Sequence, residues 1–162
     1  MRRWTVGGAL LEGPGGLLLV RNRRRNGRAD WTPPGGVIDE GETVLGGLTR
    51  EVAEETGLRV SEWEGPVYEI DALATGLGWQ LRVEVHRAVA YEGELAIDDP
   101  DGIVELARFV SADECDHHLA AAHLWVREPL LAWLGERWSG TRRFGYRVDG
   151  DDIATLSVAR VA

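Results

Sequence analysis

The stretch GVIDEGETVLGGLTREVAEETGL, residues 36–58, decides the fold of this chain. Its second half contains no proline, and Leu45, Leu48 and Val52 follow the spacing of one face of a helix. The glycine near its end stands where a helix commonly stops in the left-handed conformation. The stretch therefore predicts a helix over residues 43–56 that buries one apolar stripe against a sheet.

Three carboxylates lie together on this predicted helix. Glu54 and Glu55 come three and four positions after Glu51, so at about 100° per residue the three side chains project within one arc. The apolar stripe occupies the adjoining arc, which places the carboxylates at the rim of the packing interface. Their mutual repulsion requires a counterion, and a cluster of oxygen ligands suits Mg²⁺ or Mn²⁺. The alternative interpretation is a solvated acidic helix face.

Length, composition and charge exclude several classes of protein. The chain has 162 residues, 44% of them hydrophobic, which predicts one globular domain spanning residues 1–162. Its formal net charge of −9 opposes binding to a nucleic-acid polymer or to an acidic membrane. All 18 basic residues are arginine, so chemistry that depends on lysine, such as Schiff-base formation or a P-loop, is excluded.

Cysteine use and hydropathy bear on the location of the protein. Cys115 is the single cysteine, so no internal disulfide and no cysteine-rich zinc site can form, and a reducing cytoplasm is expected. No apolar run reaches the 18 or so residues of a membrane span. Glu12 and Pro14 interrupt the apolar residues near the start, so we do not expect a secretory signal.

The remaining segments predict short strands and helices that share one core. Residues 81–90 alternate apolar and polar side chains, as a half-buried strand does. Pro129 suits a helix only within its first turn. In chain order we expect a hairpin of residues 4–11 and 17–20, a loop at 21–30 with a rigid exit at 31–36, strands at 67–70, 81–90 and 103–110, helices at 111–122 and 128–138, and a closing hairpin at 146–158 that turns at 149–150.

The opening stretch resembles the signature box of the Nudix hydrolases, the MutT-type superfamily. That box is Gly, five residues, Glu, seven residues, Arg-Glu, an aliphatic residue, any residue, Glu-Glu, any residue, Gly and an aliphatic residue, and residues 36–58 match every specified position. The preceding segment also resembles the family's lead-in, although Pro33 stands where an aliphatic residue is common. The order of predicted elements is compatible with the family from Trp4 to about Val110.

The resemblance implies a fold that mixes helices and strands, of class α/β (α+β). In this fold, helices cover both faces of a mixed β-sheet and make an α/β/α sandwich. It also implies hydrolysis of a nucleoside diphosphate linked to another moiety, with Mg²⁺ or Mn²⁺ as the cofactor. Glu51 is a candidate general base, although in this family the base often lies outside the box. Carried over residue by residue, the metal ligands are Glu51, Glu54, Glu55 and the backbone carbonyl of Gly36, the positioning arginine is Arg50, and the earlier glutamate that supports the loop is Glu42.

Further candidates lie outside the box, where relatives often place another carboxylate and where substrate phosphates bind. We favour Asp101 or Glu105 as the extra acid over the neighbouring Asp98 and Asp99, with Glu84 as a further candidate. The segment before the box is rich in arginine. Of these arginines we favour Arg21 or Arg23 as phosphate ligands, because they come soon after the end of a predicted strand. The alternative for the acids is a polar turn without a catalytic role, and the alternative for the arginines is a solvated surface loop.

Aromatic side chains could stack on a nucleobase, and the candidates are Trp31, Trp79 and Tyr68. Seven tryptophans in a small domain mostly belong to the core, which is the alternative for each of them. His117 and His118 lack ligand spacing, so a surface or packing role is expected for both. Cys115 shows no sign of activation.

The resemblance leaves three functions open. The first is cleavage of a nucleoside triphosphate, ordinary or modified, to a monophosphate and pyrophosphate. The second is cleavage of ADP-ribose or a nucleotide sugar. The position of Pro66 argues against this function, because Pro66 follows the box more closely than the corresponding proline does in enzymes that cleave ADP-ribose. The third is a regulatory domain that binds a nucleotide without turnover, against which the intact Arg50-Glu51 pair argues. The closing hairpin could supply the interface of a homodimer.

Overall fold

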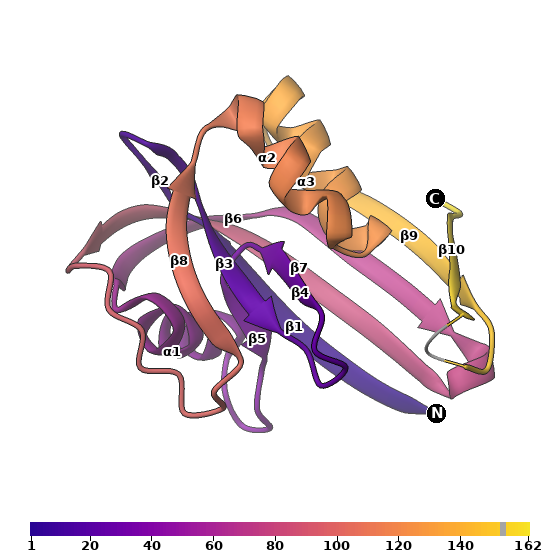
Figure 1. Cartoon of the computed structure of the whole chain (residues 1–162). Coiled ribbons are helices and arrows are strands. Elements are labelled where there is room, and N and C mark those ends of the chain that lie inside the picture. Colours follow the sequence, from indigo (N-terminus) through magenta and orange to yellow (C-terminus); the bar gives the residue numbers. More distant parts are fainter. Residues whose placement is uncertain (153–154) are drawn as a thin grey trace.

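The computed structural model describes residues 1–152 and 155–162. Strands and helices are interspersed along the chain in a mixed α+β architecture (Figure 1). The strands are β1 (Arg2–Leu10), β2 (Glu12–Gly13), β3 (Gly16–Arg23), β4 (Ala29–Thr32), β5 (Gly35–Val37), β6 (Arg59–Ala74), β7 (Trp79–Glu92), β8 (Val104–Val110), β9 (Arg142–Asp149) and β10 (Ser157–Arg160). The helices are α1 (Val44–Thr56), α2 (Ala112–His118) and α3 (Leu124–Glu136), with short 3-10 turns η1 (Thr75–Leu77) and η2 (Leu119–Ala121).

The larger of two sheets is mixed. Its strand order is β10-β9-β6-β7-β1-β5. Strand β1 runs parallel to β7 and β6 runs parallel to β9, whereas the other neighbours are antiparallel. The smaller sheet joins β2, β3 and β4, and β8 pairs with β3.

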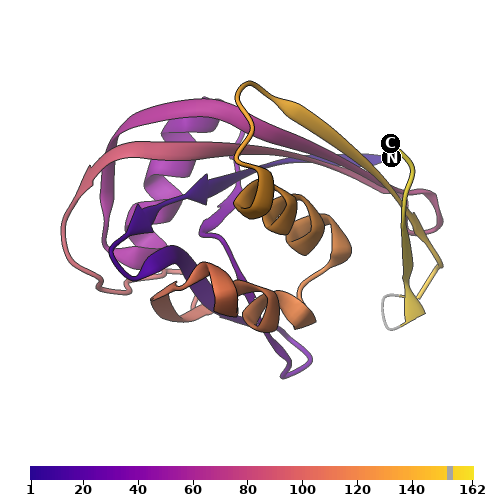
Figure 2. The same ribbon diagram turned by 90° about the horizontal axis from the view of Figure 1, so that it is seen from above.

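Helices cover both faces of the large sheet and make the predicted α/β/α sandwich. Side chains at the end of β1 and just after it alternate between two core clusters, with Leu10 in the cluster under α3 and both Ala9 and the following Leu11 in the cluster under α1. Leu48 of α1 and Leu130 of α3 are fully buried in these clusters. Figure 2 shows α3 lying along the inner side of the curved sheet. Among the described residues, no helix is both long enough and apolar enough to cross a membrane.

Helix α1 has the limits that the sequence predicts. The Thr43 hydroxyl accepts the Gly46 N–H at 3.0 Å and caps the first turn. Gly57 ends the helix with φ of 81°, in the left-handed region that favours glycine. Glycine is also required there for space, because a Cβ on Gly57 would lie 2.6 Å from the Glu94 carbonyl oxygen.

The segment between β7 and β8 is held against the end of α1. The Ala96 N–H donates to the Thr56 carbonyl at 2.9 Å, and the Asp98 N–H donates to the Glu54 carbonyl at 3.1 Å. These bonds satisfy carbonyls that the helix end leaves without partners. They also bring the acidic residues at 99–101 beside the carboxylates of α1.

Two predictions about the N-terminal strands are wrong. The hairpin expected between residues 4–11 and 17–20 forms only next to its turn, where β2 pairs with β3 and the Leu18 N–H donates to the Leu11 carbonyl at 2.9 Å, because β1 lies in the large sheet. Ala9 to Leu11 are buried on both faces, as in a central strand. The expected loop at 21–36 contains the end of β3 and both β4 and β5, and the polar pair Asn22 and Asp30 conceals the strand pattern.

Predictions about the C-terminal third need smaller corrections. Pro129 lies inside α3 rather than in a first turn, because α3 starts at Leu124, and burial of Pro129 and Leu130 offsets the missing backbone bond. The helix expected at 111–122 is α2 followed by η2. The closing hairpin forms, with Val158 opposite Val148 in β9, although residues 153–154 of its turn lie outside the described residues.

Candidate active site

A cleft of about 440 Å³ lies where α1, β5 and the segment before β8 meet. We call it the carboxylate cleft, because six carboxylates and two guanidinium groups line it. The carboxylates are Asp39, Glu51, Glu54, Glu55, Asp99 and Asp101, and the guanidinium groups are Arg24 and Arg50. Such a concentration of negative charge repels an anionic substrate unless cations enter with it.

Arg50 is the centre of the ion pairs in the carboxylate cleft. Its Nε and Nη2 donate to the two oxygens of Glu42 at 2.9 Å each, which is the bidentate geometry that a planar guanidinium allows. The remaining nitrogen, Nη1, donates to Glu51 at 3.1 Å and to Glu54 at 3.3 Å. The hydrogen bonds from Arg50 and then from the Asp39 backbone lower the pKa of Glu42 to about 2.

Glu51 and Glu55 are neighbouring carboxylates on α1, of which Glu55 is buried and Glu51 is partly buried. The Glu55 side chain is 7% exposed and accepts the Gly35 N–H at 3.3 Å. Burial, followed by the charge of Glu51, raises the pKa of Glu55 to about 9, and burial also raises the pKa of Glu51. Two carboxylates this close hold a proton between them unless a cation neutralises them.

Gly36 is packed directly against Glu51. A Cβ at this position would lie 2.7 Å from the Glu51 carboxylate carbon and 2.8 Å from either oxygen. Its neighbour Gly35 is equally confined, because a Cβ there would lie 2.0 Å from the Gly7 carbonyl oxygen. Gly36 therefore lets the backbone of β5 approach Glu51 on α1, whereas Gly35 lets β5 approach β1.

The chemistry of these groups fits a hard divalent cation. Carboxylate and carbonyl oxygens are the ligands that Mg²⁺ and Mn²⁺ prefer, and burial, together with the charges of neighbouring carboxylates, raises the pKa values of Glu51 and Glu55. Within residues 1–152 and 155–162, no three acidic, histidine or cysteine side chains already stand in a coordinating arrangement. Binding of a cation would therefore require the carboxylates to reorient until their oxygens converge on it.

The candidate extra acids separate into two groups. Asp101 and Asp99 line the carboxylate cleft. Asp99 accepts the N–H groups of residues 101, 103 and 104 at 2.9 to 3.1 Å, and its charge contributes to the raised pKa of Glu55. Glu105 lies on β8 outside the residues that line the cleft, and Glu84 is 3.3 Å from His86. Asp101 thus stays the better placed of the two favoured acids.

The arginines predicted to hold phosphates lie on the other side of β3. Arg21 donates to Glu105 at 2.8 Å, and Arg23 is also paired with Glu105. The residues that reach the cleft are Arg24, which belongs to the same arginine-rich segment but was not favoured, and Asn22, which was not predicted. The alternation of side chains along a strand would have separated the two sets, had β3 been extended to Arg23.

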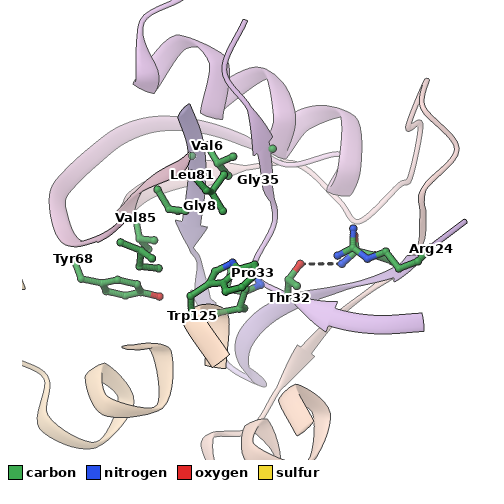
Figure 3. Close-up of a pocket in the computed structure, with 16 residues that line it drawn as sticks. Val6, Gly8, Arg24, Thr32, Pro33, Gly35, Tyr68, Leu81, Val85 and Trp125 are labelled. Carbon is green, nitrogen blue, oxygen red and sulfur yellow. Dashed lines mark hydrogen bonds between the residues drawn. The ribbon is translucent and has the colours of Figure 1, made fainter. Parts of the chain in front are cut away.

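A second cavity of about 230 Å³ adjoins the cleft, and we call it the apolar hollow (Figure 3). It shares Asn22, Arg24, Gly35 and Gly36 with the carboxylate cleft. Its other lining residues are mostly aliphatic, with two aromatic side chains. They are Val6, Gly7, Gly8, Thr32, Pro33, Tyr68, Ile70, Leu81, Val83, Val85, Trp125 and Val126.

Of the three aromatic residues considered for stacking, Tyr68 alone lines the hollow. Trp31 packs edge-on against His118 with ring centroids 5.2 Å apart, and Trp79 packs against Trp125 at 6.2 Å. Trp125 was missed, because an indole on a helix has no sequence signal that separates a cavity wall from core. Cys115 is buried, and burial raises the pKa of its thiol, which agrees with the absence of activation expected.

Comparison with known proteins gives consistent matches. The NUDIX domain model matches residues 1–134. A candidate 8-oxo-dGTP diphosphatase of Mycobacterium tuberculosis is 30% identical over 133 residues, 70% of this chain and 94% of that protein. An oxidized purine nucleoside triphosphate hydrolase of Danio rerio is 34% identical over 90 residues, 56% of this chain and 57% of that protein. The crystal structure of a MutT NUDIX hydrolase from Burkholderia pseudomallei is similar with a TM-score of 0.61 and 26% identity, over 70% of this chain and 86% of that one.

Proposed function

Because the chain belongs to the NUDIX domain family and is a pyrophosphohydrolase, we propose that it cleaves a nucleoside triphosphate, ordinary or oxidised, to a monophosphate and pyrophosphate. One observation carries this proposal. A cleft rich in carboxylates opens directly onto an apolar hollow, and the two share the backbone of Gly35 and Gly36. The cleft suits cation-bound phosphates and the hollow suits a flat ring. The names of the two relatives point to the same class of substrate.

We propose Mg²⁺ or Mn²⁺ as the cofactor, held by Glu51, Glu54, Glu55 and the carbonyl of Gly36. When bound, such a cation neutralises charge on the phosphates and makes water a better nucleophile at neutral pH. The raised pKa values of Glu51 and Glu55 support this assignment, because both carboxylates gain a favourable partner when a dication binds.

The protein's own groups would orient the reaction. Arg50 fixes Glu51 at 3.1 Å and Glu54 at 3.3 Å, while its grip on Glu42 keeps the guanidinium in place. Glu54 reaches the cleft with 28% of its side chain exposed, so it can take a proton from the attacking water. Glu51 remains the alternative base. Asp101 would serve as an additional acid at the cleft wall.

The bound nucleotide would lie across the junction of the two cavities. Its base enters the apolar hollow beside Trp125, and its phosphates extend over Gly35 and Gly36 into the carboxylate cleft. Arg24 stands at this junction and can contact a phosphate, although Asp30 holds it at 2.8 and 2.9 Å. The volume of the hollow favours a single ring system over the two bulky ends of ADP-ribose.

The remaining parts of the proposal rest on the sequence. We place the protein in the cytoplasm because Cys115 is its single cysteine. We treat residues 1–162 as one domain. A homodimer through the closing hairpin would be detected by the mass of the protein in solution.

The proposed function is tested with a panel of substrates. Release of pyrophosphate or phosphate would be measured with Mg²⁺ or Mn²⁺ on ordinary and oxidised nucleoside triphosphates, ADP-ribose and nucleotide sugars. We expect turnover of triphosphates that Glu51→Gln abolishes and that Glu62→Gln, an exposed glutamate on β6, leaves unchanged. Turnover of ADP-ribose alone would replace the proposed substrate. Nucleotide binding without any turnover would instead favour the regulatory function.

A further inference from the structure

We propose that the hydroxyl of Tyr68 determines which nucleobase the protein accepts, by hydrogen bonding to the edge of the ring that lies deepest in the apolar hollow. The proposal rests on the proposed function, in which this hollow holds the base. The proposed function describes the hollow only by its shape. The inference adds that one residue, Tyr68, recognises a particular atom of the base.

The Tyr68 side chain is fixed in a single place. It is 1% exposed, and its ring packs edge-on against Trp138 at 6.2 Å and against Phe144 at 6.0 Å between ring centroids. Its hydroxyl points away from β6 into the apolar hollow, toward Trp125 (Figure 3). A group held so firmly loses little rotamer freedom when a ligand binds it.

The Tyr68 hydroxyl has no hydrogen-bond partner among residues 1–152 and 155–162. In the same part of the chain, every side-chain nitrogen or oxygen that is sealed from solvent does have a partner. The hydroxyl is therefore not sealed, and a molecule in the hollow can reach it. A hydroxyl in an apolar wall costs free energy unless something pairs with it, so a ligand atom is its natural partner.

Other polar groups of the hollow complement this hydroxyl. The indole N–H of Trp125, which is 7% exposed, also has no partner within the described residues and can only donate. On the side shared with the cleft, both N–H groups of the Asn22 amide are used, by Asp30 at 3.1 Å and by Thr32 at 2.9 Å. The Asn22 amide oxygen is left to accept.

These groups define the ring that the hollow takes. The wall of the hollow contains a donor, the Trp125 indole, and the Tyr68 hydroxyl, and the side shared with the cleft contains an acceptor, the Asn22 amide oxygen. Aliphatic side chains such as Val83 and Val85 cover the rest and can form no hydrogen bonds. The matching ligand carries a carbonyl or ring nitrogen on its inner edge and an amino or ring N–H group near Asn22. A base without an inner acceptor would leave the Trp125 N–H unpaired and the Tyr68 hydroxyl able only to accept.

Tyr146 provides a matched control for a substitution at Tyr68. It is a tyrosine of the same core cluster, 2% exposed, and its hydroxyl donates to Glu128 at 2.8 Å instead of facing the hollow. Replacing either tyrosine with phenylalanine removes one oxygen atom. We expect Tyr146→Phe to lower Tm by a few degrees, because Glu128 loses a partner. Tyr68→Phe breaks no bond within the protein, so Tm should stay the same or rise.

The test measures kcat and KM of the wild type and both variants on dGTP, 8-oxo-dGTP, dATP, dCTP and dTTP. For the best substrate, Tyr68→Phe should raise KM about 3- to 10-fold with kcat nearly unchanged, because one neutral hydrogen bond is lost from binding. Preference among the five bases should shrink by the same factor. Tyr146→Phe should keep the wild-type preference. If Tyr68→Phe also keeps that preference, the inference is overturned while the proposed function stands.

A second measurement separates failure of the inference from failure of the proposed function. If the wild type hydrolyses none of these nucleotides, the proposed function is wrong. Titration calorimetry with the corresponding nucleoside monophosphates then decides the inference. Binding that Tyr68→Phe weakens 3- to 10-fold for one base supports the role of the hydroxyl. Equal affinities in both proteins, or no binding to the wild type, overturn it.

Discussion

Arg50 and Glu42 are joined by two hydrogen bonds of equal length, 2.9 Å each, from Nε and Nη2 to the two carboxylate oxygens. Glu42 is in turn fixed by the Asp39 N–H at 2.9 Å. The guanidinium is therefore held from behind by the loop before α1, and its third nitrogen is presented to Glu51 and Glu54. The loop and the helix of the box act as one unit through this arginine.

Arg50→Lys should keep the charge and lose the forked geometry. An ammonium cannot bind both oxygens of Glu42 and still reach Glu51 and Glu54, so the proposed metal ligands lose their orientation. We expect kcat to fall about 10- to 100-fold with little change in Tm. Arg59→Lys alters an exposed pair with Glu92 at 3.3 Å and should have no effect on kcat. Full activity of Arg50→Lys would show that charge alone is sufficient.

Gly36→Ala should displace the carboxylate of Glu51. Its Cβ would lie 2.7 Å from the carboxylate carbon, and the flexible end of Glu51 yields more readily than the backbone. We expect at least a 10-fold loss of kcat, with Tm lowered by no more than a few degrees. Gly135→Ala in α3 meets nothing within 4 Å and should raise stability by about 0.5–1 kcal/mol with normal activity. If the Gly36→Ala variant and the wild type have equal kcat, the position of the Glu51 carboxylate does not matter for catalysis and the prediction is wrong.

Without divalent cations, the stability of the protein should fall as pH rises, because of Glu55. The folded protein holds the Glu55 proton up to a pKa of about 9, against 4.5 for an ordinary glutamate. The folded state thus binds more protons than the unfolded state between these values. Stability from the protonated carboxyl is complete below about pH 4.5 and is lost as pH approaches 9.

Glu55→Gln removes this titration while keeping an acceptor for the Gly35 N–H. In EDTA at pH 8, the variant should therefore be more stable than the wild type, by about 1–3 kcal/mol. The difference should disappear as pH falls toward 4.5. Thermal unfolding of both proteins across this range measures it. A wild type more stable than the variant at pH 8 in EDTA would contradict the raised pKa of Glu55.

Addition of Mg²⁺ should reverse the order of stability at pH 8. A ligand that binds only the folded state stabilises it by about 2.7 kcal/mol at 100 times its Kd. The wild type should gain this stabilisation, and Glu55→Gln should gain less because it has lost a proposed ligand. At pH 5 the gain should shrink for the wild type, since protons compete for the same carboxylates. Equal shifts of Tm in both proteins would place the cation elsewhere.

The sequence was informative where function depends on neighbours along the chain. The carboxylates of α1, the glycine that ends this helix and the arginine of the box all lie within residues 36–58, so spacing alone brings them together. The placement of β1 could not be inferred in this way. Its partners β5 and β7 are set by pairing across the chain, with Val6 between Val37 and Val83, and a run of apolar residues fits either sheet equally well.

The sequence could not predict the apolar hollow either, because its walls also come from elements that are distant in the chain. Tyr68 and Trp125 come from β6 and α3, and each has the pattern of a core residue. An unpaired hydroxyl or indole N–H becomes visible only when the surrounding atoms are known. Arg24 was ranked below Arg21 and Arg23 for a simpler reason, because the end of β3 was predicted too early and Arg24 follows directly after this strand.

The junction at Asn22, Arg24, Gly35 and Gly36 has a consequence for protein engineering. It is the shared wall of two compartments built from different elements, one from α1 and the segment before β8, the other from β6, β7 and α3. The inner wall of the hollow can therefore be redesigned for another base without touching the hydrolytic carboxylates. Libraries confined to β6 and the start of α3 should yield variants with altered selectivity and intact turnover.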